Sequence, residues 1–186
     1  MGALIVRLVV LRHGQTDLNK NYFYNGQTEE DINEEGIKQA KEAAKTLSES
    51  NFNKIYCSPL KRTKHTCEIV NLKKQEVIYD DRLKERTLGE FDGKNLQQTS
   101  YVFSKHNHYY FKQVGKGLEN LPELFKRVHN FLDDIISSNN KDDTILIVTH
   151  GGVMRAIYFY YEEMPEDGDL SFYQAKNCEI NIYEIL

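Results

Sequence analysis

Two histidines of this chain stand where phosphate chemistry can be done. The first, His13, follows Arg12 at the end of the apolar run 4–11, and the second, His150, comes just after the run 144–148; each precedes a glycine. Ligand sites of open α/β sheets lie at the carboxyl ends of the strands, so both imidazoles are expected to face one crevice. A neutral imidazole can attack phosphorus, and the planar fork of arginine fits phosphate oxygens. The two histidines therefore predict a phosphate site at the edge of a sheet.

Two further segments carry groups that such chemistry needs. Arg62 lies in the sequence SPLKRT at 58–63, one turn into a predicted helix that follows a short strand. Its guanidinium can therefore reach the same crevice. Glu85 lies in a glycine-containing loop and is a candidate general acid. Taken alone, Arg62 would more simply be a solvated helical arginine, and Glu85 an exposed loop charge.

A sheet whose strands end together has to position these residues. Apolar runs rich in Val, Ile and Leu alternate with amphipathic stretches, which predicts an α/β fold with a mostly parallel sheet and helices on both faces. The 186 residues suffice for a single domain, 1–186, and are too few for two ordinary ones. Strands are predicted at 4–11, 55–57, 77–79, 144–148 and 179–185, and helices from an Asn33 N-cap, at 58–70 with Ser58-Pro59 as cap and first turn, at 121–137, and at 153–161 after a Gly-Gly turn.

The segment 94–121 breaks this regularity. It is rich in Tyr, Phe, Lys and His but has no firm period. Long connections of this kind are often lids. We therefore expect 94–121 to be a lid or insertion over the site, although a plain surface insertion explains the sequence equally well.

The composition and charge of the chain limit the classes of binding partner that are expected. The chain is 40% hydrophobic and 28% charged with a net charge of −4, which is typical of a soluble globular protein and gives no support for nucleic-acid binding. No apolar run approaches the length of a transmembrane helix, so no membrane partner is expected. Three cysteines without a CxxC pair, and an N-terminus without a signal-peptide pattern, favour a cytoplasmic protein without disulfides or structural zinc. His106 and His108 lie in a polar stretch and are expected to be exposed rather than metal ligands.

Four short motifs in this order resemble the histidine phosphatase superfamily, also called the phosphoglycerate mutase-like family. They are RHG at 12–14, SPLxRT at 58–63, ExxxGxxxG at 85–93 and HGG at 150–152. The resemblance spans nearly the whole chain. It implies a phosphoglycerate mutase-like three-layer sandwich and a small phosphomonoester as substrate.

The resemblance also implies a role for each residue. His13 would attack phosphorus and become a phosphohistidine, while Arg12, Arg62 and a protonated His150 would hold the phosphate. Glu85 would protonate the leaving oxygen and later activate water. No metal and no cofactor would be needed. The further phosphate-binding positions are Thr16, Asn19, Gly26 and Gly151.

Three interpretations remain open within this resemblance. A metal-independent phosphomonoesterase is favoured, because the stretch 87–126 contains no arginine with which a mutase could hold a doubly phosphorylated intermediate. Lysines at 94, 105, 112 and 116 are a looser substitute, because lysine lacks the bidentate fork. Glu85-Arg86 followed by Gly89 is similar to the mutases, however, and keeps a 2,3-bisphosphoglycerate-dependent phosphoglycerate mutase as the alternative. A catalytically silent binding module is the third. If Glu85 is the acid, the rate should follow a bell-shaped pH profile with its optimum on the acid side of neutral.

Overall fold

Five strands form one sheet in the order β3-β2-β4-β1-β5. The computed structural model describes residues 6–112, 115–140 and 142–185. The first four strands of that order run parallel, and β5 pairs with β1 in the antiparallel sense. The strands are β1 (Val6–Arg12), β2 (Lys54–Cys57), β3 (Val77–Tyr79), β4 (Thr144–Thr149) and β5 (Ile180–Ile185). The predicted α/β class and mostly parallel sheet are confirmed.

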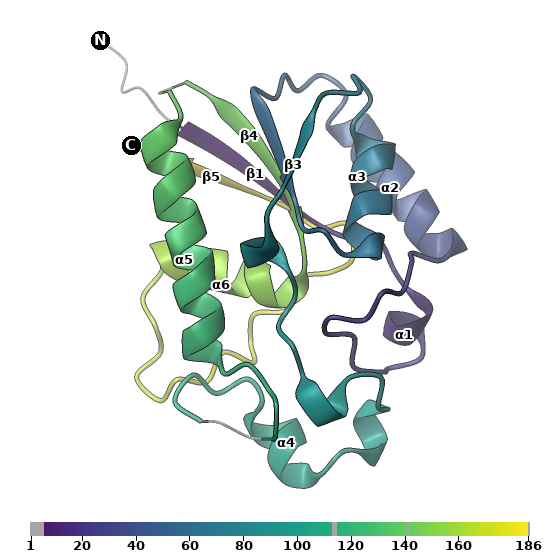
Figure 1. Cartoon of the computed structure of the whole chain (residues 1–186), viewed down its shortest axis with the longest axis vertical. Helices are drawn as coiled ribbons and strands as arrows, with labels where there is room; N and C mark the ends of the chain where they lie inside the picture. Colours follow the sequence, from purple (N-terminus) through teal and green to yellow (C-terminus); the bar gives the residue numbers. More distant parts are fainter. Residues whose placement is uncertain (1–5, 113–114, 141, 186) are drawn as a thin grey trace.

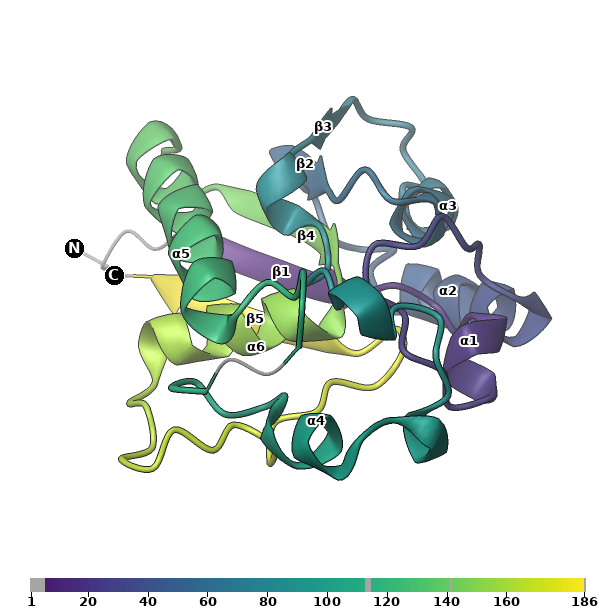
Figure 2. The same ribbon diagram turned by 60° about the horizontal axis from the view of Figure 1, so that its bottom comes forward.

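Helices cover both faces of the sheet, as Figure 1 shows, with α2 and α3 on one face and α5 and α6 on the other. The helices are α1 (Asp17–Lys20), α2 (Glu34–Thr46), α3 (Lys61–Val70), α4 (Tyr101–His106), α5 (Leu121–Ser138) and α6 (Gly151–Tyr161). In Figure 1 the short helices α1 and α4 both lie in the lower half of the view, and in Figure 2 α1 lies at the right and α4 at the bottom. No helix within the described ranges has the length and apolar content needed to cross a bilayer.

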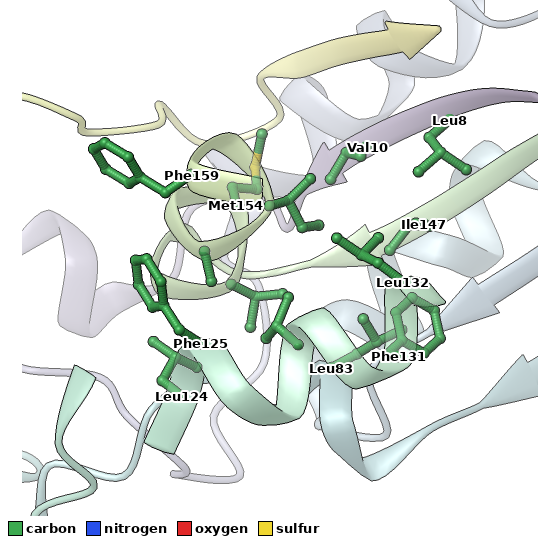
Figure 3. Packing of buried hydrophobic residues seen from close by; sticks show 14 of the residues in the cluster. Leu8, Val10, Leu83, Leu124, Phe125, Phe131, Leu132, Ile147, Met154 and Phe159 are labelled. Atoms are coloured by element: carbon green, nitrogen blue, oxygen red, sulfur yellow. The ribbon is translucent and has the colours of Figure 1, made fainter. Parts of the chain in front are cut away.

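The core is divided by the sheet into two layers. Leu8 and Val10 of β1 pack with α5 and α6, whereas Val9 and Leu11 pack with α2 and α3. Because successive side chains of a strand point to opposite faces, this division requires apolar residues at successive positions of the buried part of β1, which explains the continuous apolar run 8–11. Figure 3 shows the first layer, in which Phe131 of α5 lies near the strands.

Two helices begin elsewhere than predicted. The helix α3 starts at Lys61 with Leu60 as its N-cap, so Ser58 does not cap it. The helix α6 starts at Gly151, directly after His150, so the two glycines form its first turn rather than a separate Gly-Gly turn. The first difference leaves the Ser58 hydroxyl available for another partner. The second brings the amino end of α6 next to His150.

The segment 94–121 holds the short helix α4 and is tied to neighbouring loops. Phe103 is buried beside Phe91 and Leu118 in a small apolar cluster of its own, separate from the two main layers. Isolated bridges join Asn95 to Phe23 and Tyr109 to Asp169. The segment therefore packs on the domain through its aromatic residues. That it closes over the site stays a prediction.

Candidate active site

The carboxyl ends of β1 and β4 bring the two histidines together. Arg12 pairs with Thr149 in the register of these parallel strands, and the His13 amide donates to the Thr149 carbonyl at 3.0 Å. The rings of His13 and His150 lie with their centroids 5.2 Å apart. Both side chains are almost fully buried. The predicted common crevice is therefore built by adjacent strands, as the sequence pattern required.

The imidazole of His13 is held as a neutral base. Its Nδ1 lies 2.7 Å from the carbonyl oxygen of Gly14, and Arg62 Nε donates to its Nε2 at 3.3 Å. A carbonyl can only accept, so the ring proton is on Nδ1 and Nε2 carries a lone pair. Burial, and then the charges of Arg62 and Arg12, lower the pKa of His13 well below 6.5. Nε2 is therefore an unprotonated nitrogen at neutral pH.

Arg62 is completely buried and is held by backbone carbonyls. Its Nη1 donates to Thr28 O at 2.9 Å and its Nη2 to Gly26 O at 2.6 Å. Burial lowers its pKa to about 10, so it stays charged at neutral pH. Gly26 is needed here, since a Cβ at this position would lie 2.7 Å from the carbonyl oxygen of Arg86. The amide of Gly26 donates to Asp92 Oδ1 at 2.8 Å, so this residue supports Arg62 and does not present its amide to the crevice.

His150 is paired with Ser58, a residue for which the sequence indicated only a capping role. The Ser58 hydroxyl lies 2.7 Å from His150 Nε2, while His150 Nδ1 is buried and finds no partner among the described residues. Burial, and then the charges of Arg62, His13 and Arg12, lower the pKa of His150 well below 6.5. The expectation of a protonated His150 is therefore wrong for the protein as it stands. A charge on this ring has to come with the anion that binds beside it.

The amino end of α6 supplies further positive potential. Its free amides and helix dipole favour an anion at this point. Arg12 lies against it, since a Cβ at Gly151 would be 3.6 Å from the Arg12 guanidinium carbon. Arg12 Nη1 donates to the carbonyl of Ala175 at 2.6 Å, and Arg12 Nε is buried without a partner in the described chain. Arg12 and Gly151 thus lie where the sequence placed them.

Glu85 binds the same helix end. Its Oε2 accepts from the Gly152 amide at 3.1 Å and its Oε1 from the Arg86 amide at 2.8 Å. Arg127 donates to the Glu85 carbonyl at 3.3 Å and is itself paired with Glu119 through Nε at 2.6 Å. The carboxylate is therefore anchored one residue along α6 from Gly151, within the cluster that holds Arg12.

Thr16 and Asn19 belong to the cap of α1. The fully buried Thr16 hydroxyl accepts from the Asn19 amide at 3.2 Å and from Asn25 Nδ2 at 3.0 Å. Asn19 Oδ1 accepts from Asn177 Nδ2 at 3.3 Å, which ties α1 to the loop before β5. Thr16 therefore positions Asn19, whose amide nitrogen is the group left to meet a ligand.

Sequence reasoning missed several residues of this site. Ser58 was assigned to a cap, and Asn177 lies in a loop without a motif. Arg155 could have been found, because a single arginine inside the apolar run 153–161 needs hydrogen-bond partners in a core. It is buried, and its Nη1 lies 3.0 Å from His108 Nδ1. The expectation that His108 is exposed is therefore wrong.

The chain matches the histidine phosphatase superfamily, branch 1, over residues 8–186. It belongs to the histidine phosphatase superfamily. Phosphoserine phosphatase 1 of Hydrogenobacter thermophilus is 30% identical over 187 residues, covering 98% of this chain and 86% of that protein. A 2,3-bisphosphoglycerate-dependent phosphoglycerate mutase of Azorhizobium caulinodans is 26% identical, covering 87% and 84%.

The solved structures give the same fold. A phosphoserine phosphatase from Entamoeba histolytica, in complex with 3-phosphoglyceric acid, superposes with a TM-score of 0.83 at 25% identity, covering 95% of this chain and 89% of that one. The phosphoglycerate mutase-like architecture is thereby confirmed for this histidine phosphatase. The family, with the phosphatases among its members, makes the chain a phosphoric monoester hydrolase.

Proposed function

We propose that this histidine phosphatase is a metal-independent phosphomonoesterase that hydrolyses a small phosphorylated metabolite through a phosphohistidine on His13. The observation that carries the proposal is the state of His13: its Nε2 is unprotonated, faces Arg62, and is kept neutral by burial and two guanidiniums. An unprotonated nitrogen that accepts a long hydrogen bond from Arg62 and lies beside fixed positive charge is what attack on a phosphate requires.

In the first step, His13 Nε2 forms a bond to phosphorus while the bond from phosphorus to the ester oxygen breaks. Arg12, Arg62 and the α6 amides oppose the negative charge that phosphoryl transfer spreads over the equatorial oxygens. Glu85 gives its proton to the leaving oxygen, a contribution of roughly 10²–10⁴-fold for a positioned acid.

In the second step, water attacks the phosphohistidine. Glu85, now a carboxylate, takes a proton from that water as the nitrogen–phosphorus bond breaks and inorganic phosphate forms. Hydrogen bonds from the backbone amides of Arg86 and Gly152 hold the Glu85 carboxylate in place for both steps. His13 loses its phosphoryl group and returns to the neutral ring.

The phosphoserine phosphatases among the relatives support phosphoserine as a first substrate to test. A mutase of 3-phosphoglycerate is the second candidate, because two buried arginines, Arg86 and Arg155, lie near Glu85 and offer the fixed forks that the exposed lysines of 87–126 do not. A binding module without turnover is the third.

One set of assays separates these candidates. Hydrolysis of p-nitrophenyl phosphate in the presence of a metal chelator is expected for a metal-independent phosphatase, with the optimum on the acid side of neutral. No release of phosphate from any ester would leave only the binding module. Conversion of 3-phosphoglycerate with traces of 2,3-bisphosphoglycerate, faster than phosphate release, would make it a mutase.

A further inference from the structure

Four of the seven arginines in this chain feel the charge of Glu85 and yet form no salt bridge within the described part of the chain. Among the described residues, Arg82 and Arg127 are the arginines that form ion pairs. The other buried or partly buried guanidiniums are held by backbone carbonyls instead. A carbonyl fixes a guanidinium in place but leaves its charge uncompensated, and an uncompensated buried charge is costly. The members of this unpaired set are Arg12, Arg62, Arg86 and Arg155.

Only half of this charge is accounted for by the phosphate pocket. Arg12 and Arg62 are the arginines whose charges lower the pKa of His13, after burial. Arg155 and Arg86 instead act on His108, where they add to burial and lower its pKa to about 3. Arg86 and Arg155 therefore make up a second cationic group, which the proposed reaction on His13 does not use.

The second group is rigidly built. Arg86 is 5% exposed and donates through Nε to the Glu119 carbonyl at 2.6 Å, and through Nη1 to the Asn107 carbonyl. Arg155 is 7% exposed and donates through Nη2 to the Tyr173 carbonyl at 2.8 Å. Segments distant in the sequence thus converge to fix two guanidiniums that have no salt-bridge partner among the residues the structure describes.

Two hydrogen-bond donors, one on Arg86 and one on the neighbouring His108, have no partner among the described residues. Arg155 Nη1 can only donate to His108 Nδ1, at 3.0 Å, so the ring proton of His108 is on Nε2. Among the described residues, neither this nitrogen nor Arg86 Nη2 has a hydrogen-bond partner. Both are pure donors in this state, so the ligand they suit is an oxyanion.

The position of Arg86 and Arg155 relative to Glu85 indicates which part of a substrate they would contact. Glu85 is the acidic group that most opposes the effect of burial on Arg86 and on Arg155, as it is for Arg12 and Arg62. Glu85 precedes Arg86 in the chain and accepts from the Gly152 amide of α6, three residues before Arg155, so it lies close to the second cationic group. Because attack is in line, the leaving oxygen is on the side of phosphorus opposite His13, which is where the acid proposed to be Glu85 has to act.

We propose that Arg86, Arg155 and His108 form a subsite that binds a carboxylate on the leaving group of the substrate. The inference rests on the proposed phosphomonoesterase function and adds the residues that would select phosphate esters of small hydroxy acids or hydroxyamino acids over esters without a carboxylate. Arg155 and His108 are the specificity-determining pair of this subsite, because one orients the other.

The test compares substrates that differ in the carboxylate alone. Phosphoserine is paired with phosphoethanolamine, and 3-phosphoglycerate with 2-hydroxyethyl phosphate. A charge-assisted contact predicts that kcat/KM in the wild type favours the carboxylate member by roughly 10- to 100-fold. Arg155→Gln and His108→Gln should each reduce this preference at least several-fold, through KM, and Arg155→Lys should keep part of it.

Arg7→Gln is the matched control, because Arg7 is an exposed arginine of β1 outside the cluster. It should leave the preference where it is. Thermal midpoints and p-nitrophenyl phosphate turnover are measured for every variant, so that a misfolded Arg155→Gln protein is recognised and His108→Gln decides.

The outcomes separate the two proposals. Equal kcat/KM for the paired substrates in the wild type overturns the subsite and leaves the phosphatase intact. So does a preference that survives both folded variants. Absence of turnover on every ester, p-nitrophenyl phosphate included, overturns the proposed function itself.

Discussion

Gly152→Ala is a small change that should selectively damage the acid. A Cβ at position 152 would lie 2.3 Å from Glu85 Oε1 and 3.5 Å from Leu124 Cδ2. Leu124 is fully buried and has no room to move. The Glu85 carboxylate therefore has to move by about 1 Å and lose its hydrogen bond from the Gly152 amide. A misplacement of this size in a reacting group costs on the order of 100-fold in rate.

The loss should depend on the leaving group. An alkyl ester such as phosphoserine needs its oxygen protonated, whereas p-nitrophenolate can leave without a proton. We expect kcat/KM for phosphoserine to fall by about 100-fold and that for p-nitrophenyl phosphate by less than about tenfold. The assay is a series of aryl and alkyl phosphates ranked by the pKa of the leaving alcohol. In the variant, the rate should depend more steeply on that pKa.

Gly151→Ala is the matched control in the same helical turn. Its Cβ would meet only the Arg12 guanidinium at 3.6 Å, an ordinary contact distance. This variant should change the rates without steepening their dependence on the leaving group. Equal losses for aryl and alkyl esters in Gly152→Ala, or no loss at all, would refute the assignment of Glu85 as the acid.

Two further predictions concern stability. Burial lowers the pKa of His13, His150 and His108, so the unfolded chain binds more protons than the folded one below pH 6.5 and the free energy of unfolding should fall as the pH drops. In His108→Gln, the slope of the free energy of unfolding against pH should therefore be smaller by up to about 1.4 kcal/mol per pH unit between pH 6 and 4, as measured by urea denaturation. An unchanged slope contradicts the burial of a neutral His108. Thr16→Ala removes the α1 cap and should cost about 1 kcal/mol, seen as a thermal midpoint lower by about 2–4 °C, and should raise KM through Asn19. Asn33→Ala, which removes the cap of α2, should cost similar stability with little change in KM.

The elements that carry the histidines could be predicted because their signals are local. A strand buried on both faces is a continuous apolar run, so β1 and β4 stand out, and a residue just past each strand must lie at the sheet edge. The first residues of α3 and α6 were harder to predict from the sequence. Nothing local distinguishes Ser58 as a cap from Ser58 as the partner of His150, since that choice depends on a β2–β4 register set by long-range pairing.

The charge states of the site were beyond sequence reasoning. The motif placed Arg12 and Arg62 near His150, but whether that ring is charged depends on how far water is excluded and how near the guanidiniums lie. Both are tertiary facts, and together they lower the pKa of His150. The second cationic group has the same origin, because Arg86 and Arg155 are far apart in sequence and meet only through the packing of α6 against the 94–121 segment.

The central claim is that His13 carries the phosphoryl group during turnover. The direct measurement is a rapid quench into alkali of the enzyme with excess substrate, followed by digestion and mass spectrometry. We expect a phosphate adduct on the His13 peptide, stable to alkali and labile to acid, formed before steady-state product. We also expect no adduct and no turnover in His13→Ala. An adduct on another residue, or full activity of His13→Ala, would contradict the claim.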